Sequence, residues 1–173
     1  MITRLFNTVG PRQTGAYGMV IPRLAKQAVE GQALTVYADG RQSRCFCDVR
    51  DVVRALTGLA ECAGAQGEIF NVGSEQEITI LELARRIIGL AESGSKIDFI
   101  PYQTAYDSDF EDMRRRVPNT GKVRRLLGWV PRIPLDETLR QVIAEFSARA
   151  AGARGIAATE SPVIPAQAPV LPA

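Results

Sequence analysis

The chain alternates between short apolar runs that fit a strand and longer segments whose apolar residues lie three and four positions apart. The helical spacing predicts helices over Val20–Val29, after Asp48 to about Ala63, from Thr79 to Ala91, from Asn119 to Leu127 and from Leu135 onward. The short runs predict strands at Ile2–Phe6, Leu34–Tyr37, Ser43–Cys47, Glu68–Val72 and Lys96–Ile100. Residues 7–12 and 102–117 are expected to be irregular.

Several residue types mark the ends of these elements. Asp48 is suited to cap a helix, and Thr79 with Glu82 fits the reciprocal capping box. Gly31 is expected to end the first helix, and Gly40 to adopt a positive φ in the turn at residues 38–40. In the helix after Asp48, the positions expected to face the core are Val52, Val53, Leu56, Leu59, Ala60 and Ala63.

The composition predicts one folded domain and a tail. The chain has 173 residues, of which 46% are hydrophobic and 23% charged, as is usual for a globular protein. We expect the domain to span residues 1–150. Residues 151–173 shift to alanine, proline, glycine and valine with little charge, so they are expected to form a disordered tail.

Charge and rare residues narrow the function classes. The formal net charge of +2 gives no global field for nucleic acid, and no apolar run is long enough to span a membrane, so neither partner is expected. The chain has no histidine, and we expect no metal site. Cys45, Cys47 and Cys62 lack the C-x-x-C spacing, and we expect free thiols in a reducing cytoplasm.

The stretch from Leu34 to Val53 carries the first candidate chemistry, because it places Tyr37 and Arg44 beside a tight turn, where both are expected to face one pocket. Strand alternation sends Arg44, Phe46 and Asp48 to one side and Cys45 and Cys47 to the other. Arg44 is then either a solvated side chain or a donor fork for phosphate oxygens.

Two further positions have both a plain and a functional interpretation. Asn7 follows a strand, where it makes a local turn bond or, if that strand is parallel to its neighbours, contacts a ligand. The run from Arg114 to Arg116 is either a solvated loop or a set of cations that closes over an anion.

Four motifs, in order along the chain, resemble the extended short-chain dehydrogenase/reductase family, specifically its NAD-dependent nucleotide-sugar epimerases, dehydratases and decarboxylases. They are Arg4-Leu-Phe-Asn-Thr-Val-Gly-Pro-Arg12, Leu34-Thr-Val-Tyr37 with Gln42-Ser-Arg44, Arg116-Val-Pro-Asn119, and Leu126-Leu-Gly-Trp129 before Pro131. The resemblance covers residues 2–148 and is to the carboxyl-terminal, substrate-binding half of that family.

This resemblance implies an α/β fold, a partial Rossmann-type fold with short strands and about five helices. It also implies roles for individual residues. Asn7 would contact the diphosphate or the sugar, Val20 and Tyr37 would line the nucleobase pocket, and Arg44 and Arg116 would clamp the diphosphate from two sides.

The family also implies NAD as cofactor, but the chain lacks its glycine-rich phosphate loop and its Tyr-x-x-x-Lys pair. The residues four places after the four tyrosines are Ile21, Arg41, Tyr106 and Phe110. We therefore expect no catalytic residue in this chain and no turnover by the chain alone.

Three functions remain open from the sequence. The first is the UDP-sugar-binding part of an enzyme similar to UDP-glucose 4-epimerase, and the second is the same part of a UDP-glucuronate decarboxylase. The third is a non-catalytic or vestigial binding module. The expected partners are a UDP-sugar and either a separate amino-terminal half or a second copy of the chain.

Overall fold

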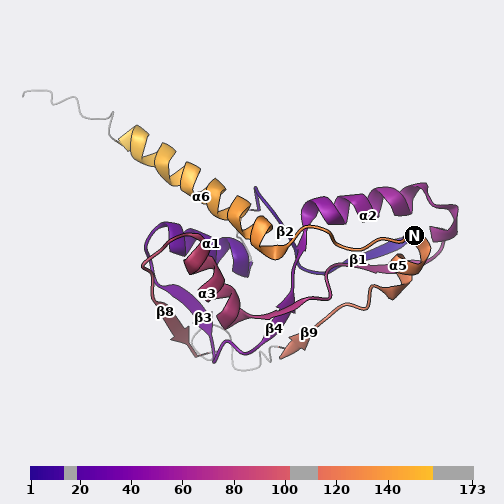
Figure 1. The fold of residues 1–173 in the computed structure, drawn as a ribbon, viewed down its shortest axis with the longest axis horizontal. Helices are drawn as coiled ribbons and strands as arrows, with labels where there is room; N and C mark the ends of the chain where they lie inside the picture. Colours follow the sequence, from indigo (N-terminus) through magenta and orange to yellow (C-terminus); the bar gives the residue numbers. More distant parts are fainter. Residues whose placement is uncertain (14–18, 102–112, 158–173) are drawn as a thin grey trace, which may run out of the picture.

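The computed structural model describes residues 1–13, 19–101 and 113–157 (Figure 1). Its helices are α1 (Val20–Val29), α2 (Val49–Glu61), α3 (Ile80–Leu90), α5 (Gly121–Leu127) and α6 (Leu135–Ala157), with a short 3₁₀ helix at Ala63–Ala65. Its strands are β1 (Ile2–Leu5), β2 (Thr8–Val9), β3 (Leu34–Tyr37), β4 (Ser43–Cys45), β5 (Cys47–Asp48), β6 (Ile69–Val72), β7 (Glu77–Thr79), β8 (Ile97–Ile100) and β9 (Arg115–Arg116). The expected α/β class is confirmed.

The strands form several small sheets. Parallel pairs join β1 to β6, β2 to β5 and β3 to β8, while β4 lies between antiparallel β7 and parallel β9. Figure 1 shows β3 and β8 at one end of the molecule, β1 and β6 at the other, and β4 between them. Each strand therefore depends on a partner that is distant in sequence.

Buried side chains form two hydrophobic cores. The first core lies among α1, β3, α3 and α6 and consists of Val9, Ile21, Leu24, Ala25, Ala28, Leu34, Val36, Phe46, Ile78, Ile80, Leu83, Ala84, Ile87, Leu139, Val142 and Ile143. The second core lies among α2, β6 and α5 and consists of Cys47, Val52, Ala55, Leu59, Ala65, Phe70, Val72, Val123 and Trp129. The two ends of the molecule in Figure 1 correspond to these two cores.

The predicted continuous strand Ser43–Cys47 is wrong, because the chain changes sheets at Phe46. Phe46 packs in the first core and Cys47 in the second. The simple alternation of faces therefore fails here, and all four side chains from Cys45 to Asp48 are buried. The break arises because β4 pairs with β7 and β9, whereas β5 pairs with β2.

Local signals at the helix ends agree well with the structure. The predicted helix Val20–Val29 has these bounds, and Gly31 and Gly40 have φ values of 70° and 69°. The Thr79 Oγ1 accepts a hydrogen bond from the Glu82 backbone N–H at 3.1 Å, which is the first half of the predicted capping box, while the Glu82 carboxylate accepts from Arg86. Because such caps involve neighbouring residues, they are readable from the sequence.

Three short strands were not predicted. β2 lies in the expected loop at residues 7–12, β7 ends at Thr79, the first residue of the predicted capping box, and β9 lies in the expected irregular stretch at residues 102–117. Of that stretch, residues 102–112 lie outside the described part. Each of these strands has two or three residues, so hydrogen bonds to a distant partner define it more than its own composition does.

The predicted buried face of α2 is too wide. Val52 and Leu59 are buried at 2% and 1% exposure, but Val53 is 53% exposed. Ala60 and Ala63 are exposed as well. The second core covers only a narrow stripe of the helix, so apolar residues outside this stripe face solvent.

α6 continues past residue 150 to Ala157, and residues 158–173 lie outside the described part of the chain. The domain limit at residue 150 and the disorder of the tail remain predictions. No helix in the described part is both long and apolar enough to cross a membrane.

Candidate functional site

Asn7 lies two residues after β1, beyond the carboxyl end of a strand that is parallel to β6. Its φ of 40° is in the left-handed region, which asparagine tolerates better than most residues. Its Nδ2 donates to the Cys45 carbonyl oxygen at 2.8 Å, and its carbonyl oxygen accepts from the Cys47 N–H at 3.2 Å. Asn7 therefore holds the end of β1 beside β4, where the chain changes sheets.

Arg44 and Arg116 are register partners on the neighbouring parallel strands β4 and β9. Residues opposite each other on adjacent strands project from the same face of a sheet, so these two arginines share a face. Arg44 Nη1 donates to the Met113 and Ser43 carbonyl oxygens at 2.8 Å each. The Arg116 guanidinium carbon lies 5.5 Å from the centroid of the Phe6 ring, and Phe6 precedes Asn7 in the sequence. Neighbouring contacts thus bring Asn7, Arg44 and Arg116 together.

Gly73 permits this close arrangement at the end of β6. A Cβ at this position would lie 2.8 Å from the Phe6 Cβ and 3.4 Å from the Pro118 Cγ. A side chain there would clash with Phe6 and push it away from the end of β6. The position therefore requires glycine if Phe6 is to remain under Arg116.

Arg115 projects from the opposite face, because side chains alternate along a strand. Its Nη2 lies 2.6 Å from Glu77 Oε1, and Ser43 Oγ donates to Glu77 Oε2 at 2.9 Å. Hydrogen bonds from Arg115 and Ser43 lower the pKa of Glu77. Within the run from Arg114 to Arg116, Arg115 therefore pairs with the Glu77 carboxylate, on the opposite face of the sheet from Arg116.

Tyr37 and Val20 flank a residue that the sequence analysis missed. Val20 begins α1 and is half-buried against the first core. One turn later, the Arg23 guanidinium carbon lies 4.5 Å from the centroid of the Tyr37 ring. The spacing of three residues from Val20 was the available signal, since residues i and i+3 are neighbours on a helix surface. That Tyr37 and Arg44 face one pocket remains a prediction.

The Asp48 carboxylate caps α2 and bonds to Arg50 and Thr138. Its Oδ1 accepts from the Arg50 backbone N–H at 2.8 Å, and its Oδ2 accepts from Thr138 Oγ1 at 2.8 Å. Burial raises the pKa of Asp48, but the hydrogen bonds from Arg50 and Thr138 outweigh it and leave the pKa below its usual value. The carboxylate is therefore charged and neutralised where it lies, as the predicted helix cap requires.

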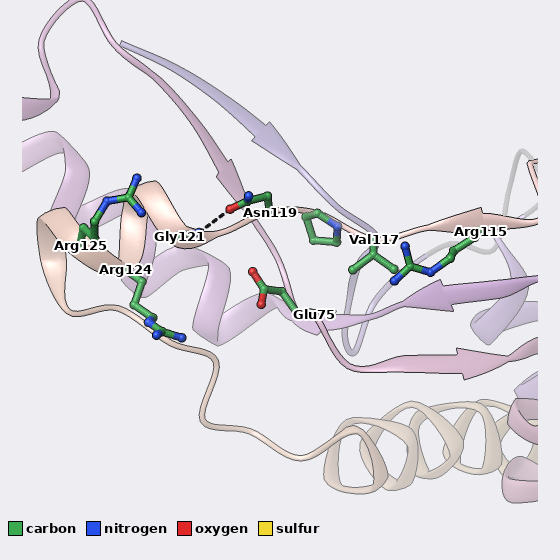
Figure 2. A pocket seen from close by; sticks show the side chains of 8 residues that line it. Glu75, Arg115, Val117, Asn119, Gly121, Arg124 and Arg125 are labelled. Carbon is green, nitrogen blue, oxygen red and sulfur yellow. Dashed lines mark hydrogen bonds between the residues drawn. The ribbon is translucent and has the colours of Figure 1, made fainter.

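A polar pocket of about 470 Å³ lies on the Arg115 side of β9 (Figure 2). Its lining residues are Glu75, Arg115, Val117, Pro118, Asn119, Gly121, Arg124 and Arg125. Glu75 Oε1 accepts from the Thr120 N–H at 2.8 Å, and Asn119 Oδ1 accepts from the Gly121 N–H at 3.0 Å. In Figure 2, Arg115 lies at one end and Arg124 and Arg125 at the other. This pocket neighbours the predicted clamp but contains neither of its arginines.

The described residues do not fit the pyrophosphate of NAD at the starts of α2 and α3. The Asp48 carboxylate occupies the first turn of α2, and Asp51 adds a second negative charge there. The Thr79 hydroxyl caps α3, and Glu82 lies in its first turn. Dinucleotide sites instead use a glycine-rich turn that leaves the helix N–H groups open to phosphate.

Comparison with known proteins agrees with the motifs. Residues 1–73 match the sequence model of the NAD dependent epimerase/dehydratase family. A UDP-N-acetyl-alpha-D-glucosaminuronate decarboxylase from Bacillus cytotoxicus is 40% identical over 146 residues, which are 84% of this chain and 45% of that protein. The chain is therefore similar to the NAD-dependent epimerase/dehydratase family, by the family model over residues 1–73 and by the decarboxylase along 84% of its length.

Solved structures of this family share the fold. An epimerase from Methanothermobacter thermautotrophicus matches with a TM-score of 0.78 and 30% identity, over 88% of this chain and 44% of that chain. A UDP-glucose 4-epimerase from Thermotoga maritima, solved with UDP-glucose, matches with a TM-score of 0.72 and 25% identity, over 86% of this chain and 46% of that chain. The partial Rossmann-type fold expected for this family is confirmed, and the chain spans less than half the length of each of these three relatives.

Proposed function

We propose that this chain binds the diphosphate of a UDP-sugar between Arg44 and Arg116. The observation that carries the proposal is their register pairing on β4 and β9, from which both arginine side chains leave on one face of the sheet. A diphosphate carries about two negative charges, and planar donor forks neutralise such groups in a fixed orientation.

The other predicted residues take matching places in this proposal. Asn7 lies next to the arginine pair through its bond to the Cys45 carbonyl and contacts the diphosphate or the sugar. Val20 and Tyr37, on either side of Arg23, line the nucleobase pocket. A tyrosine ring supplies apolar area to a flat base at a small entropic cost.

The arginine pair is tested by titrating UDP into the full chain by calorimetry. Arg44→Ala and Arg116→Ala are each expected to weaken UDP binding by roughly 10- to 100-fold, because each removes charge-assisted hydrogen bonds. The matched control is Arg115→Ala, which changes the adjacent residue on the opposite face, where it pairs with Glu77. Equal losses in all three variants would reject the clamp.

Two reactions are candidates for the whole enzyme. The sequence motifs fit a UDP-glucose 4-epimerase, our first candidate, without separating it from a UDP-glucuronate decarboxylase, and the 40% identical relative is a UDP-N-acetyl-alpha-D-glucosaminuronate decarboxylase. Comparing UDP-glucose with UDP-glucuronic acid in the same titration separates them. A decarboxylase site holds the additional carboxylate, so tighter binding of UDP-glucuronic acid supports decarboxylation, and tighter binding of UDP-glucose supports epimerisation.

The chain is proposed to bind the substrate without turning it over. The 173 residues contain no Tyr-x-x-x-Lys pair, and the starts of α2 and α3 do not suit NAD. Chain mixed with NAD and UDP-glucose is expected to yield no UDP-galactose, as followed by chromatography. Conversion would disprove this, and a wild-type chain that binds no UDP would instead support the vestigial-module alternative.

A further inference from the structure

The Arg23 side chain is held in an unusual way for a structural arginine. Its Nη2 donates to the Thr35 carbonyl oxygen on β3 at 3.2 Å, and its guanidinium carbon lies 4.5 Å from the centroid of the Tyr37 ring. Its Nε is buried and has no hydrogen-bond partner among the residues that the structure describes. The contact with the Tyr37 ring and one hydrogen bond to the Thr35 carbonyl therefore together hold the guanidinium.

In this placement, one nitrogen of the Arg23 guanidinium can donate hydrogen bonds to a ligand. Arg23 is half-buried as a whole, with Nε inside and Nη2 on the Thr35 carbonyl. Within residues 1–13, 19–101 and 113–157, Nη1, which carries two N–H donors, is the nitrogen that remains. Buried donors in folded proteins are nearly always satisfied, so the contacts that tie α1 to β3 do not account for all the donors of this half-buried guanidinium.

We infer that Arg23 reads the nucleobase by donating from Nη1 to a carbonyl oxygen of the uracil ring, which makes it a specificity-determining residue. This inference rests on the proposed function, which puts the base beside Val20 and Tyr37. Uracil has two carbonyl oxygens, and arginine offers only donors, so the two groups are complementary. The stack on Tyr37 holds the donor plane in advance, which reduces the entropy lost on binding.

The test compares UDP with inorganic pyrophosphate, because pyrophosphate engages the arginine clamp and has no base. Both are titrated into the full chain and its variants by calorimetry. Arg23→Ala is expected to weaken UDP binding by about 10-fold and to leave pyrophosphate binding unchanged within about twofold. Arg23→Lys is expected not to restore UDP binding, because lysine keeps the charge but lacks the planar fork.

A control variant separates base recognition from helix packing. Gln27 lies one turn after Arg23, and its Nε2 donates to Thr35 Oγ1 at 3.1 Å while its Oε1 accepts from the Thr35 N–H at 3.1 Å. Gln27→Ala therefore loosens the same α1–β3 contact without touching Tyr37. It is expected to leave the ratio of UDP to pyrophosphate affinity unchanged.

The outcomes distinguish this inference from the proposed function. If Arg23→Ala weakens UDP and pyrophosphate equally, or Arg23→Lys restores UDP binding, Arg23 does not read the base and the inference is overturned. If Arg44→Ala has no effect but Arg23→Ala selectively weakens UDP binding, the clamp fails and base reading stands. If the wild-type chain binds UDP no more tightly than pyrophosphate, the result supports the Arg44–Arg116 clamp and overturns base recognition by Arg23. If the chain binds neither ligand, both proposals are wrong.

Discussion

β1 and β3 are strands of equal length, each in a parallel pair, yet their surroundings differ sharply. β3 packs against α1 and α3 and buries Leu34 and Val36 completely, both at 0% exposure. β1 buries none of its four residues, and Ile2 and Leu5 are 59% and 45% exposed. Parallel strands are usually covered on both faces. The first core therefore supports its parallel pair, whereas the second core supports β1 mainly through β6.

The comparison also explains where the candidate site lies. Asn7, Arg44 and Arg116 gather where the two regions meet, at the end of β1 and along β4 and β9, whereas Val20 and Tyr37 belong to the first region. The residues proposed to line the nucleobase pocket thus belong to the region around the well-packed first core. The diphosphate side depends on how firmly β1 is held.

The largest expected effect comes from matched isoleucine substitutions in the two regions. Ile87 in α3 is 0% exposed in the first core, and Ile2 in β1 is 59% exposed. Ile87→Ala is expected to lower the free energy of unfolding by about 2–5 kcal/mol, and Ile2→Ala by less than about 1 kcal/mol. Urea unfolding followed by circular dichroism measures both. Similar losses would mean that β1 is covered in solution, and would remove the contrast between the strands.

An intermediate effect is expected from acid, which acts on the carboxylates that join the regions. Asp48, at the start of α2, accepts from Thr138 of α6, and Asp51 Oδ2 accepts from the Arg132 and Ile133 N–H groups at 2.8 Å each. Burial raises the pKa of Asp51, but hydrogen bonds from Arg54, Ile133 and Arg132 bring it below its usual value. Both carboxylates are therefore stabilising in their charged form.

Because the pKa values of Asp48 and Asp51 are lower in the folded chain than in the unfolded chain, their stabilisation is complete above about pH 4 and is lost as the pH falls further. Each is expected to contribute roughly 1–3 kcal/mol. The measurement is the free energy of unfolding between about pH 7 and about pH 3. In the Asp48→Asn, Asp51→Asn double variant, the free energy of unfolding should fall less between these two pH values than in the wild-type chain. If it falls by the same amount, other carboxyl groups cause the loss of stability in acid.

The smallest perturbation is thiol labelling, which reports local opening without changing the sequence. Burial raises the pKa of Cys45 to about 11 and that of Cys47 to about 12, whereas Cys62 is half-buried. In iodoacetamide at neutral pH, Cys62 is expected to react first, because thiolates are the reactive form and burial blocks access. Mass spectrometry identifies the labelled residue. Labelling of Cys47 before global unfolding would show that the second region opens separately, and labelling of Cys45 first would contradict the burial.

The candidate residues were predictable from motifs, but their arrangement was not. The motifs named Arg44 and Arg116, which are 72 positions apart, and only the parallel pairing of β4 with β9 puts them opposite each other. Arg23 was missed because its significance depends on the Tyr37 ring, which another element supplies. A side chain's partners are set by packing, and no local pattern encodes them.

The sequence by itself determined the features that depend on near neighbours: the bounds of α1, the hydroxyl cap of α3, the carboxylate cap of α2 and the positive φ at Gly40. The tertiary structure decided which strands pair, where the chain leaves one sheet for another at Phe46, and why Val53 faces solvent. The physical reason is range. A cap or a turn is stabilised within a few residues, whereas a strand of two or three residues exists only where a distant segment completes its hydrogen bonds.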